Sequence, residues 1–126
     1  MMKKLLIVDD DNNIRLLIKQ TLEELEDIDI YEAGDAETAL EFIEKVPVDL
    51  ILLDISLPNM DGYELLRRLG SMECQKQTKT FIITAKAQEK EVNIGIELGA
   101  DMYITKPFDP EYLLIKTCEY LGISIE

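Results

Sequence analysis

The chain has 126 residues, with 13 Lys and Arg against 26 Asp and Glu, so its formal net charge is −13, and it contains no histidine. That length suits one domain of roughly 100–150 residues, and a strongly negative charge disfavours direct binding to nucleic acid or to an anionic membrane. The missing histidine excludes a Ser-His-Asp triad, a histidine metal ligand and a phosphohistidine on this chain.

We expect one domain over residues 1–126, located in the cytoplasm. The 47% apolar composition suffices for a hydrophobic core. The longest apolar runs fall far short of the roughly 18 residues that a membrane span requires. The N-terminus is too short and too acidic for a signal peptide.

Short apolar runs alternate with amphipathic segments along the first third of the chain. Residues 5–8 are continuously apolar, which is typical of a strand buried on both faces. Residues 14–25 carry apolar side chains at helical spacing, and residues 28–33 predict a second strand. Asp35 is a suitable N-cap for a helix that ends before Pro47.

The middle of the chain predicts a third unit of the same kind. Residues 50–53 form the most hydrophobic strand. Asp61 and Glu64 have the spacing of a capping box that opens a helix ending near Leu69. Residues 70–79 are predicted to be a polar loop.

Two more strands and two more helices complete the pattern. Residues 80–83 and 102–105 predict strands, and residues 89–98 predict a helix that a glycine ends. The last helix begins with an aspartate N-cap followed by proline, at residues 109–110, and ends at Gly122.

The order of these elements predicts an α/β fold with a (βα)5 arrangement. Continuously apolar strands alternating with helices indicate a parallel sheet covered on both faces. Five units are too few for an eight-stranded barrel, so we expect a doubly wound five-stranded sheet in the flavodoxin-like order 2-1-3-4-5.

Polar residues follow the predicted strands. Asp9 and Asp10 follow the first strand, Asp54 the third, Thr84 ends the fourth, and Lys106 follows the fifth. In the order 2-1-3-4-5 the first and third strands are neighbours at the switch point, where ligands of such sheets bind. The three aspartates are therefore expected to converge, with Thr84 and Lys106 across the pocket.

This set of side chains favours phosphoryl chemistry. Clustered carboxylates must take up protons or hold a cation, and an all-oxygen ligand set suits Mg²⁺ better than zinc or iron. A dication and the Lys106 ammonium would together accommodate a dianionic phosphoryl group. An aspartate can itself attack phosphorus, and the Thr84 hydroxyl can hydrogen-bond a phosphoryl oxygen.

Along essentially its whole length the sequence resembles the receiver domain of two-component response regulators, of the chemotaxis-Y type, either stand-alone or cut from a longer protein. Each matching motif is weak alone, but all occur in order. They are LIVDDD at 6–11, LLD at 52–54, PNMDG at 58–62, TA at 84–85, GAD at 99–101 and KPF at 106–108.

The resemblance implies a phosphorylation site and a Mg²⁺ site. Asp54 would be the phosphoacceptor. Asp10, Asp54 and the backbone carbonyl of Ser56 would bind Mg²⁺, and Asp9 would help through the metal's water shell.

The resemblance also implies a switch. Thr84 and Lys106 would bind the phosphoryl group, and a cis peptide bond between Lys106 and Pro107 would direct the lysine into the pocket. Tyr103 occupies the position of the family's rotating aromatic residue. Thr84 and Tyr103 would couple phosphorylation to the face formed by the fourth helix, the fifth strand and the fifth helix.

The implied partners follow from the family and from the absence of histidine. The phosphoryl group would come from a sensor histidine kinase, a histidine phosphotransfer protein or a small acyl phosphate. The phosphorylated domain would act on a downstream protein target or on a missing effector domain, without binding nucleic acid directly. The chain would be a monomer or a phosphorylation-dependent dimer. It would be a signalling domain that catalyses only its own phosphorylation and dephosphorylation.

Two other classes share parts of this pattern. A Mg²⁺-dependent phosphatase with an aspartate nucleophile would need a cap over its substrate and a second acid/base aspartate two residues after Asp54, where Ser56 stands. A flavin-binding module would need a Ser/Thr/Gly-rich phosphate loop after the first strand, which here is acidic. The signalling switch is favoured over both.

Overall fold

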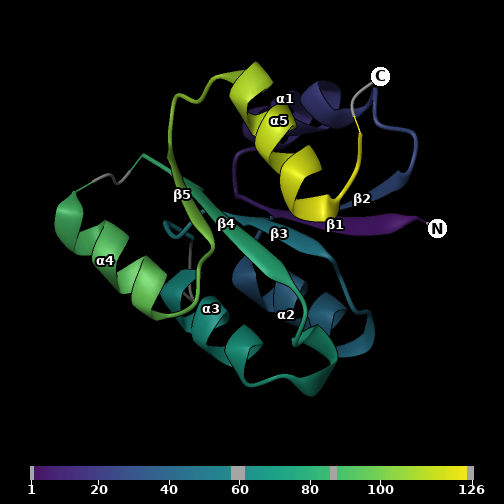
Figure 1. The fold of residues 1–126 in the computed structure, drawn as a ribbon. Coiled ribbons are helices and arrows are strands. Elements are labelled where there is room, and N and C mark those ends of the chain that lie inside the picture. Colours follow the sequence, from purple (N-terminus) through teal and green to yellow (C-terminus); the bar gives the residue numbers. More distant parts are fainter. Residues whose placement is uncertain (1, 58–61, 86–87, 125–126) are drawn as a thin grey trace.

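The computed structural model describes residues 2–57, 62–85 and 88–124, in which strands and helices alternate along the chain (Figure 1). The strands are β1 (Lys3–Val8), β2 (Ile28–Ala33), β3 (Leu50–Leu53), β4 (Lys79–Thr84) and β5 (Met102–Thr105). The helices are α1 (Asn12–Leu22), α2 (Ala36–Lys45), α3 (Gly62–Gly70), α4 (Glu89–Glu97) and α5 (Pro110–Leu121), and a short 3₁₀ turn spans Glu73–Gln75.

The strands form one parallel sheet in the order β2-β1-β3-β4-β5, which confirms the predicted flavodoxin-like (βα)5 fold. The chain moves outward in one direction from β1 to β2 and in the other from β3 to β5. The carboxyl ends of β1 and β3 therefore mark the switch point of the sheet. Among the described residues, no helix is both long enough and apolar enough to span a bilayer.

Helices cover both faces of the sheet: α1 and α5 lie on one side, and α2, α3 and α4 on the other (Figure 1). Side chains of β1 alternate between the two cores, because successive residues of a strand point to opposite faces. Leu5 and Ile7 pack in the core beneath α1 and α5, whereas Leu6 and Val8 pack in the core beneath α2 and α3. All four are essentially inaccessible to solvent, as the continuous apolar run predicts.

Local capping signals set several helix ends where the sequence predicts them. The side chains of Asp35 and Asp109 accept backbone N–H bonds at the starts of α2 and α5, and Pro110 opens α5. Gly122 ends α5 in the left-handed conformation, with φ of 68°, which glycine adopts without steric cost. Asp61, the predicted cap of α3, lies outside the described residues.

The prediction of a plain polar loop over residues 70–79 was wrong. Helix α3 reaches Gly70, the turn Glu73–Gln75 follows, and β4 already begins at Lys79. Within the turn, Gln75 is only 4% exposed. A buried polar side chain in a connection needs hydrogen-bond partners, because leaving it unpaired is costly.

Gln75 ties this connection to the last turn of α2 and to the segment between α2 and β3. Its Nε2 donates to the carbonyls of Ile43 and Val46 at 2.7 and 2.8 Å. Its Oε1 accepts from the backbone N–H of Val48 at 3.0 Å and from the hydroxyl of Thr78 at 2.7 Å. One side chain thus satisfies backbone groups at the C-terminal end of α2 and in the segment that leads into β3.

We expect Gln75→Ala to lower the free energy of unfolding by about 2–4 kcal/mol, because it leaves several buried backbone groups without partners. The matched change at the exposed Gln77, Gln77→Ala, should alter it by less than about 0.5 kcal/mol. Urea denaturation followed by circular dichroism measures both. Equal stability of the two variants would contradict this role of Gln75.

Candidate functional site

The site begins with the pairing of β1 and β3. Val8 and Leu53 are register partners at the ends of these strands, so Asp9 and Asp54 follow side by side. Their backbones continue the sheet, since the Asp54 N–H donates to the Val8 carbonyl at 2.9 Å and the Asp9 N–H donates to the Ala33 carbonyl at 3.1 Å. The backbones of the two aspartates are therefore anchored to the neighbouring strands.

Three carboxylates meet at this edge. Asp9, Asp10 and Asp54 each offer an oxygen, and these oxygens lie within 4.8 Å of one another. Asp9 is 3% and Asp54 6% exposed, whereas Asp10 is exposed to solvent. The pocket thus combines two buried acids with an open side from which an ion or a phosphoryl donor can approach.

Lys106 enters the same pocket from the end of β5. Its Nζ lies 2.8 Å from Oδ2 of Asp9 and 2.8 Å from Oδ2 of Asp54. The Lys106 backbone N–H donates to the carbonyl of Thr84 at 2.8 Å, and the peptide bond between Lys106 and Pro107 is cis. One ammonium therefore joins the ends of three strands.

Burial and charge act on these groups in opposite directions. Burial raises the pKa of Asp9, and the hydrogen bonds from Lys106 and from the Asp11 N–H offset only part of that effect. Burial alone lowers the pKa of Lys106, but the hydrogen bonds to Asp54 and Asp9 outweigh it, so the pKa is raised. Lys106 is therefore held as a cation at neutral pH.

Backbone groups fix the remaining carboxylate oxygens. Oδ1 of Asp9 accepts from the Asp11 N–H at 2.9 Å, and Oδ1 of Asp54 accepts from the Ser56 N–H at 2.9 Å. Both carboxylates are thus oriented by short loops that follow their strands. Ser56 is brought next to the pocket through its backbone, while its side chain is exposed.

The donor set fits Mg²⁺. Asp9, Asp10 and Asp54 offer oxygen ligands, which this hard cation prefers, and Asp10 leaves an exposed side where water can complete the coordination shell. Among the described residues the cluster includes no histidine or cysteine that would favour zinc. A bound dication would also offset the repulsion that three adjacent carboxylates create.

Thr84 and Tyr103 lie beside the pocket on β4 and β5. Thr84 ends β4, is fully buried and pairs in register with Thr105. Tyr103 pairs with Ile82 and is partly buried. Thr84 is joined to the pocket lysine by the hydrogen bond from the Lys106 N–H to its carbonyl, whereas the Tyr103 ring lies on the sheet face that α4 covers, next to Gly95.

Tyr63 of α3 links this part of the sheet to α4, a contact that the sequence analysis missed. Its hydroxyl lies 3.0 Å from the carbonyl and 3.1 Å from Oε2 of Glu91, and it also hydrogen-bonds Tyr103. Burial raises the pKa of Tyr103, and the hydrogen bond with Tyr63 offsets part of this rise. No sequence motif identifies Tyr63, because its partners lie on other elements.

Comparison with known proteins agrees with this fold. The family model described as the response regulator receiver domain matches residues 5–117. The chain is 41% identical over 110 residues to the alkaline phosphatase synthesis transcriptional regulatory protein PhoP of Bacillus subtilis, covering 87% of this chain and 45% of the relative. It is 40% identical over 116 residues to the transcriptional regulatory protein SrrA of Staphylococcus aureus, covering 92% and 46%.

Solved structures show the same likeness. The chemotaxis response regulator CheY4 of Vibrio cholerae superposes with a TM-score of 0.86 at 29% identity, covering 95% of this chain and 99% of that one. The BeF3-activated DrrB receiver domain superposes with a TM-score of 0.84 at 33% identity, covering 97% and 99%. The chain belongs to the response regulator receiver domain family of two-component signalling. It spans about half the length of the curated relatives it matches.

We expect Lys106→Met to lower the free energy of unfolding by about 1–3 kcal/mol, because it leaves Asp9 and Asp54 adjacent without their shared cation. Added Mg²⁺ should recover part of that loss by binding the folded carboxylates. Thermal unfolding with Mg²⁺ or with EDTA measures both effects.

Lys116→Met is the matched control, because Lys116 pairs with Glu119 on the surface of α5, away from the pocket. Its unfolding should show a much smaller change and no additional response to Mg²⁺. A Lys106 variant as stable as its parent in EDTA would contradict the role assigned to this ion pair.

Proposed function

We propose that this chain is a phosphorylation-dependent switch in which Asp54 accepts a phosphoryl group. The observation that carries the proposal is the convergence of three carboxylates and one lysine at the switch point of the sheet. Membership of a signalling-domain family supports the same function and disfavours the alternative of a phosphatase acting on external substrates.

The reaction transfers a phosphoryl group to a carboxylate oxygen of Asp54. The new bond joins that oxygen to phosphorus, and the bond from phosphorus to a histidine nitrogen of the donor, or to the acyl oxygen of an acyl phosphate, breaks. The leaving group takes the electron pair of the broken bond. Asp54 is suited to this role because the Ser56 N–H and the Lys106 ammonium already orient its two oxygens.

Asp10, Asp54 and the backbone carbonyl of Ser56 would hold Mg²⁺, with Asp9 helping through the metal's water shell. The bound ion would supply positive charge that offsets the charge on the transferred group. Lys106, now shared between Asp9 and Asp54, is close enough to turn its ammonium to a phosphoryl oxygen. Its raised pKa keeps it positively charged for this contact. The family resemblance and the oxygen-only donor set support this assignment.

Phosphorylation would then change the face formed by α4, β5 and α5. Thr84 would donate its hydroxyl to a phosphoryl oxygen, and Tyr103 would move with it. The supporting geometry is that Thr84 lies at the end of β4 next to β5, and that Tyr103 is linked through Tyr63 to Glu91 of α4. A ligand at Asp54 can shift this equilibrium only by its differential affinity for the two arrangements.

The partners proposed are a sensor histidine kinase or a histidine phosphotransfer protein as donor, and a downstream protein or an effector domain as target. The relatives' names as transcriptional regulators support an effector domain as this target. The family's signalling role supports a cytoplasmic location. We also propose that residues 1–126 form one receiver domain, and that the protein is a monomer or a phosphorylation-dependent dimer. Its charge of −13 disfavours nucleic-acid contacts by this domain itself.

Incubation with acetyl phosphate should add one phosphoryl group in the presence of Mg²⁺ and none in EDTA. Asp54→Asn should abolish the addition. Asp11→Asn is the matched control, because Asp11 caps α1 beside the pocket and asparagine caps equally well. Intact-mass spectrometry measures the product, and phosphorylation of a folded Asp54→Asn variant would contradict the proposal.

Phosphorylation should shift the backbone amide resonances of Thr84, Tyr103 and helix α4 more than those of α2. Thr84→Ser retains a hydroxyl and should preserve these shifts. Thr84→Ala should still be phosphorylated but should lose them. Two-dimensional NMR measures the response, and shifts confined to the residues around Asp54 in the parent protein would contradict the switching role.

A further inference from the structure

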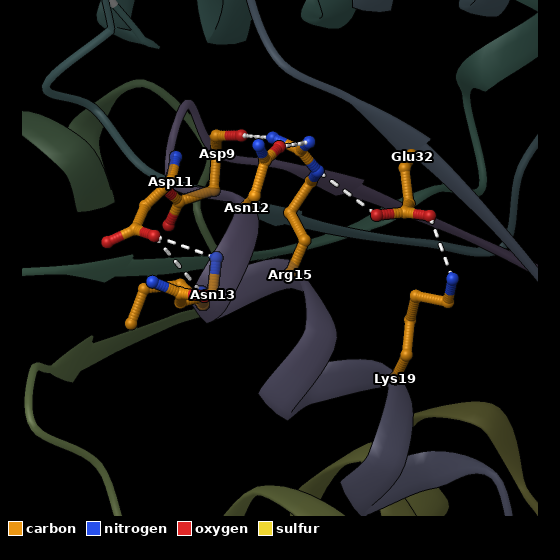
Figure 2. Close-up of polar contacts among 8 residues, drawn as sticks. Asp9, Asp11, Asn12, Asn13, Arg15, Lys19 and Glu32 are labelled. Carbon is orange, nitrogen blue, oxygen red and sulfur yellow. Dashed lines mark hydrogen bonds and ion pairs between the residues drawn. The ribbon is translucent and has the colours of Figure 1, made fainter.

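Arg15 of α1 hydrogen-bonds three acceptors beside the acidic loop, residues 9–11: one on β2, one in the loop and one at the start of α1 itself. Its Nε donates to Oε1 of Glu32 at 3.0 Å, one terminal nitrogen donates to the backbone carbonyl of Asp9, and the other donates to the side-chain oxygen of Asn12 (Figure 2). The Arg15 side chain is only 15% exposed. All three guanidinium nitrogens are therefore hydrogen-bonded.

The carbonyl that Arg15 holds belongs to the peptide bond between Asp9 and Asp10. The peptide group is planar, so fixing its oxygen also fixes the N–H of Asp10 and the direction in which the Asp10 chain leaves. On its other side Asp9 is already fixed, because its N–H donates to the Ala33 carbonyl. Arg15 thus completes the anchoring of the two adjacent pocket aspartates.

Glu32 of β2 holds the guanidinium in place. Its second oxygen pairs with Lys19 of α1 at 3.0 Å, so one carboxylate bridges two bases (Figure 2). The hydrogen bond from Lys19 and, less strongly, the one from Arg15 lower the pKa of Glu32. Glu32 therefore stays ionised at neutral pH and orients Arg15 toward the loop.

Arginine suits this position better than lysine does. A guanidinium presents several N–H groups in a rigid plane and can bond three acceptors at once, whereas an ammonium on a flexible stem acts as a point charge. Gly34 lies against the guanidinium, where a Cβ would be 3.4 Å from the nitrogen that holds Asp9. The Arg15 guanidinium therefore lies between β2, the turn after it and the acidic loop.

We propose that Arg15 is a positioning residue for the Mg²⁺ and phosphoryl-acceptor pocket, acting through the Asp9 carbonyl to fix Asp9 and Asp10 opposite Asp54. This inference rests on the proposed function. Groups that orient metal ligands from outside the coordination shell typically change metal affinity by about 10–100-fold when removed.

The test measures Mg²⁺ affinity in the absence of any phosphoryl donor, by NMR titration of the Asp10, Asp11 and Ser56 amides. Arg15→Met should weaken Mg²⁺ binding about tenfold. Arg15→Lys should recover only part of the loss, because lysine cannot bond all three acceptors. With acetyl phosphate, the Mg²⁺ concentration for half-maximal phosphorylation should rise similarly, and the rate at saturating Mg²⁺ should return to within about twofold of the parent's.

Two control variants separate positioning from general stability. Lys19→Met removes the other ion pair of Glu32 but leaves the contact with Asp9 intact, and Arg67→Met removes an ion pair with Glu64 on α3. Both should bind Mg²⁺ with parental affinity. Backbone order parameters of Asp10 and Asp11 in the metal-free protein provide a second readout, and they should fall only in the Arg15 variants.

Parental Mg²⁺ affinity and unchanged order parameters in a folded Arg15→Met variant would overturn the inference. A parent protein that binds no Mg²⁺ would instead contradict the proposed function. In that case the order parameters still decide the positioning role, because they are measured without metal.

Discussion

The ion pair of Lys106 with both Asp9 and Asp54 is the interaction on which the site depends. Two nearly buried carboxylates would repel each other, and burial would strengthen that repulsion. The Lys106 ammonium lies 2.8 Å from each and holds the ends of β1, β3 and β5 together. Lys106 therefore offsets the repulsion between the two carboxylates, while the cluster still offers oxygens that suit a dication.

The same arrangement explains why the site lies at this edge of the sheet. In a parallel sheet all strands end on one side, and reversal of the winding between β1 and β3 leaves that edge uncovered by crossover helices. The acidic loop is reinforced from β2 through Arg15 and Glu32, and β5 is linked to α4 through Tyr103 and Tyr63. A charge change at Asp54 thus has contacts leading both to the acidic loop at residues 9–11 and to the face of α4 and β5.

Much of the fold was predictable because local rules determined it. The strands at 28–33, 50–53 and 102–105 match their predicted bounds, since apolar runs bounded by turn residues leave few alternatives. The convergence of the pocket residues followed from strand order and strand ends. The contacts of Gln75 and Arg15 were missed because their partners lie in other elements. The backbone partners of Gln75 outside its own turn are 27–32 residues away, and the ion-pair partner of Arg15 is 17 residues away. Such residues become neighbours only through tertiary packing.

The most direct test of the central claim locates the phosphoryl group. The protein is treated with acetyl phosphate and Mg²⁺ and then with sodium borohydride, which reduces an acyl phosphate to an alcohol and so converts the modified aspartate to homoserine. Tandem mass spectrometry of the digested protein then identifies the converted position. The account predicts conversion to homoserine at Asp54 alone. Conversion at Asp9, Asp10 or Asp11 in its place would contradict the assignment of Asp54 as the phosphoryl acceptor.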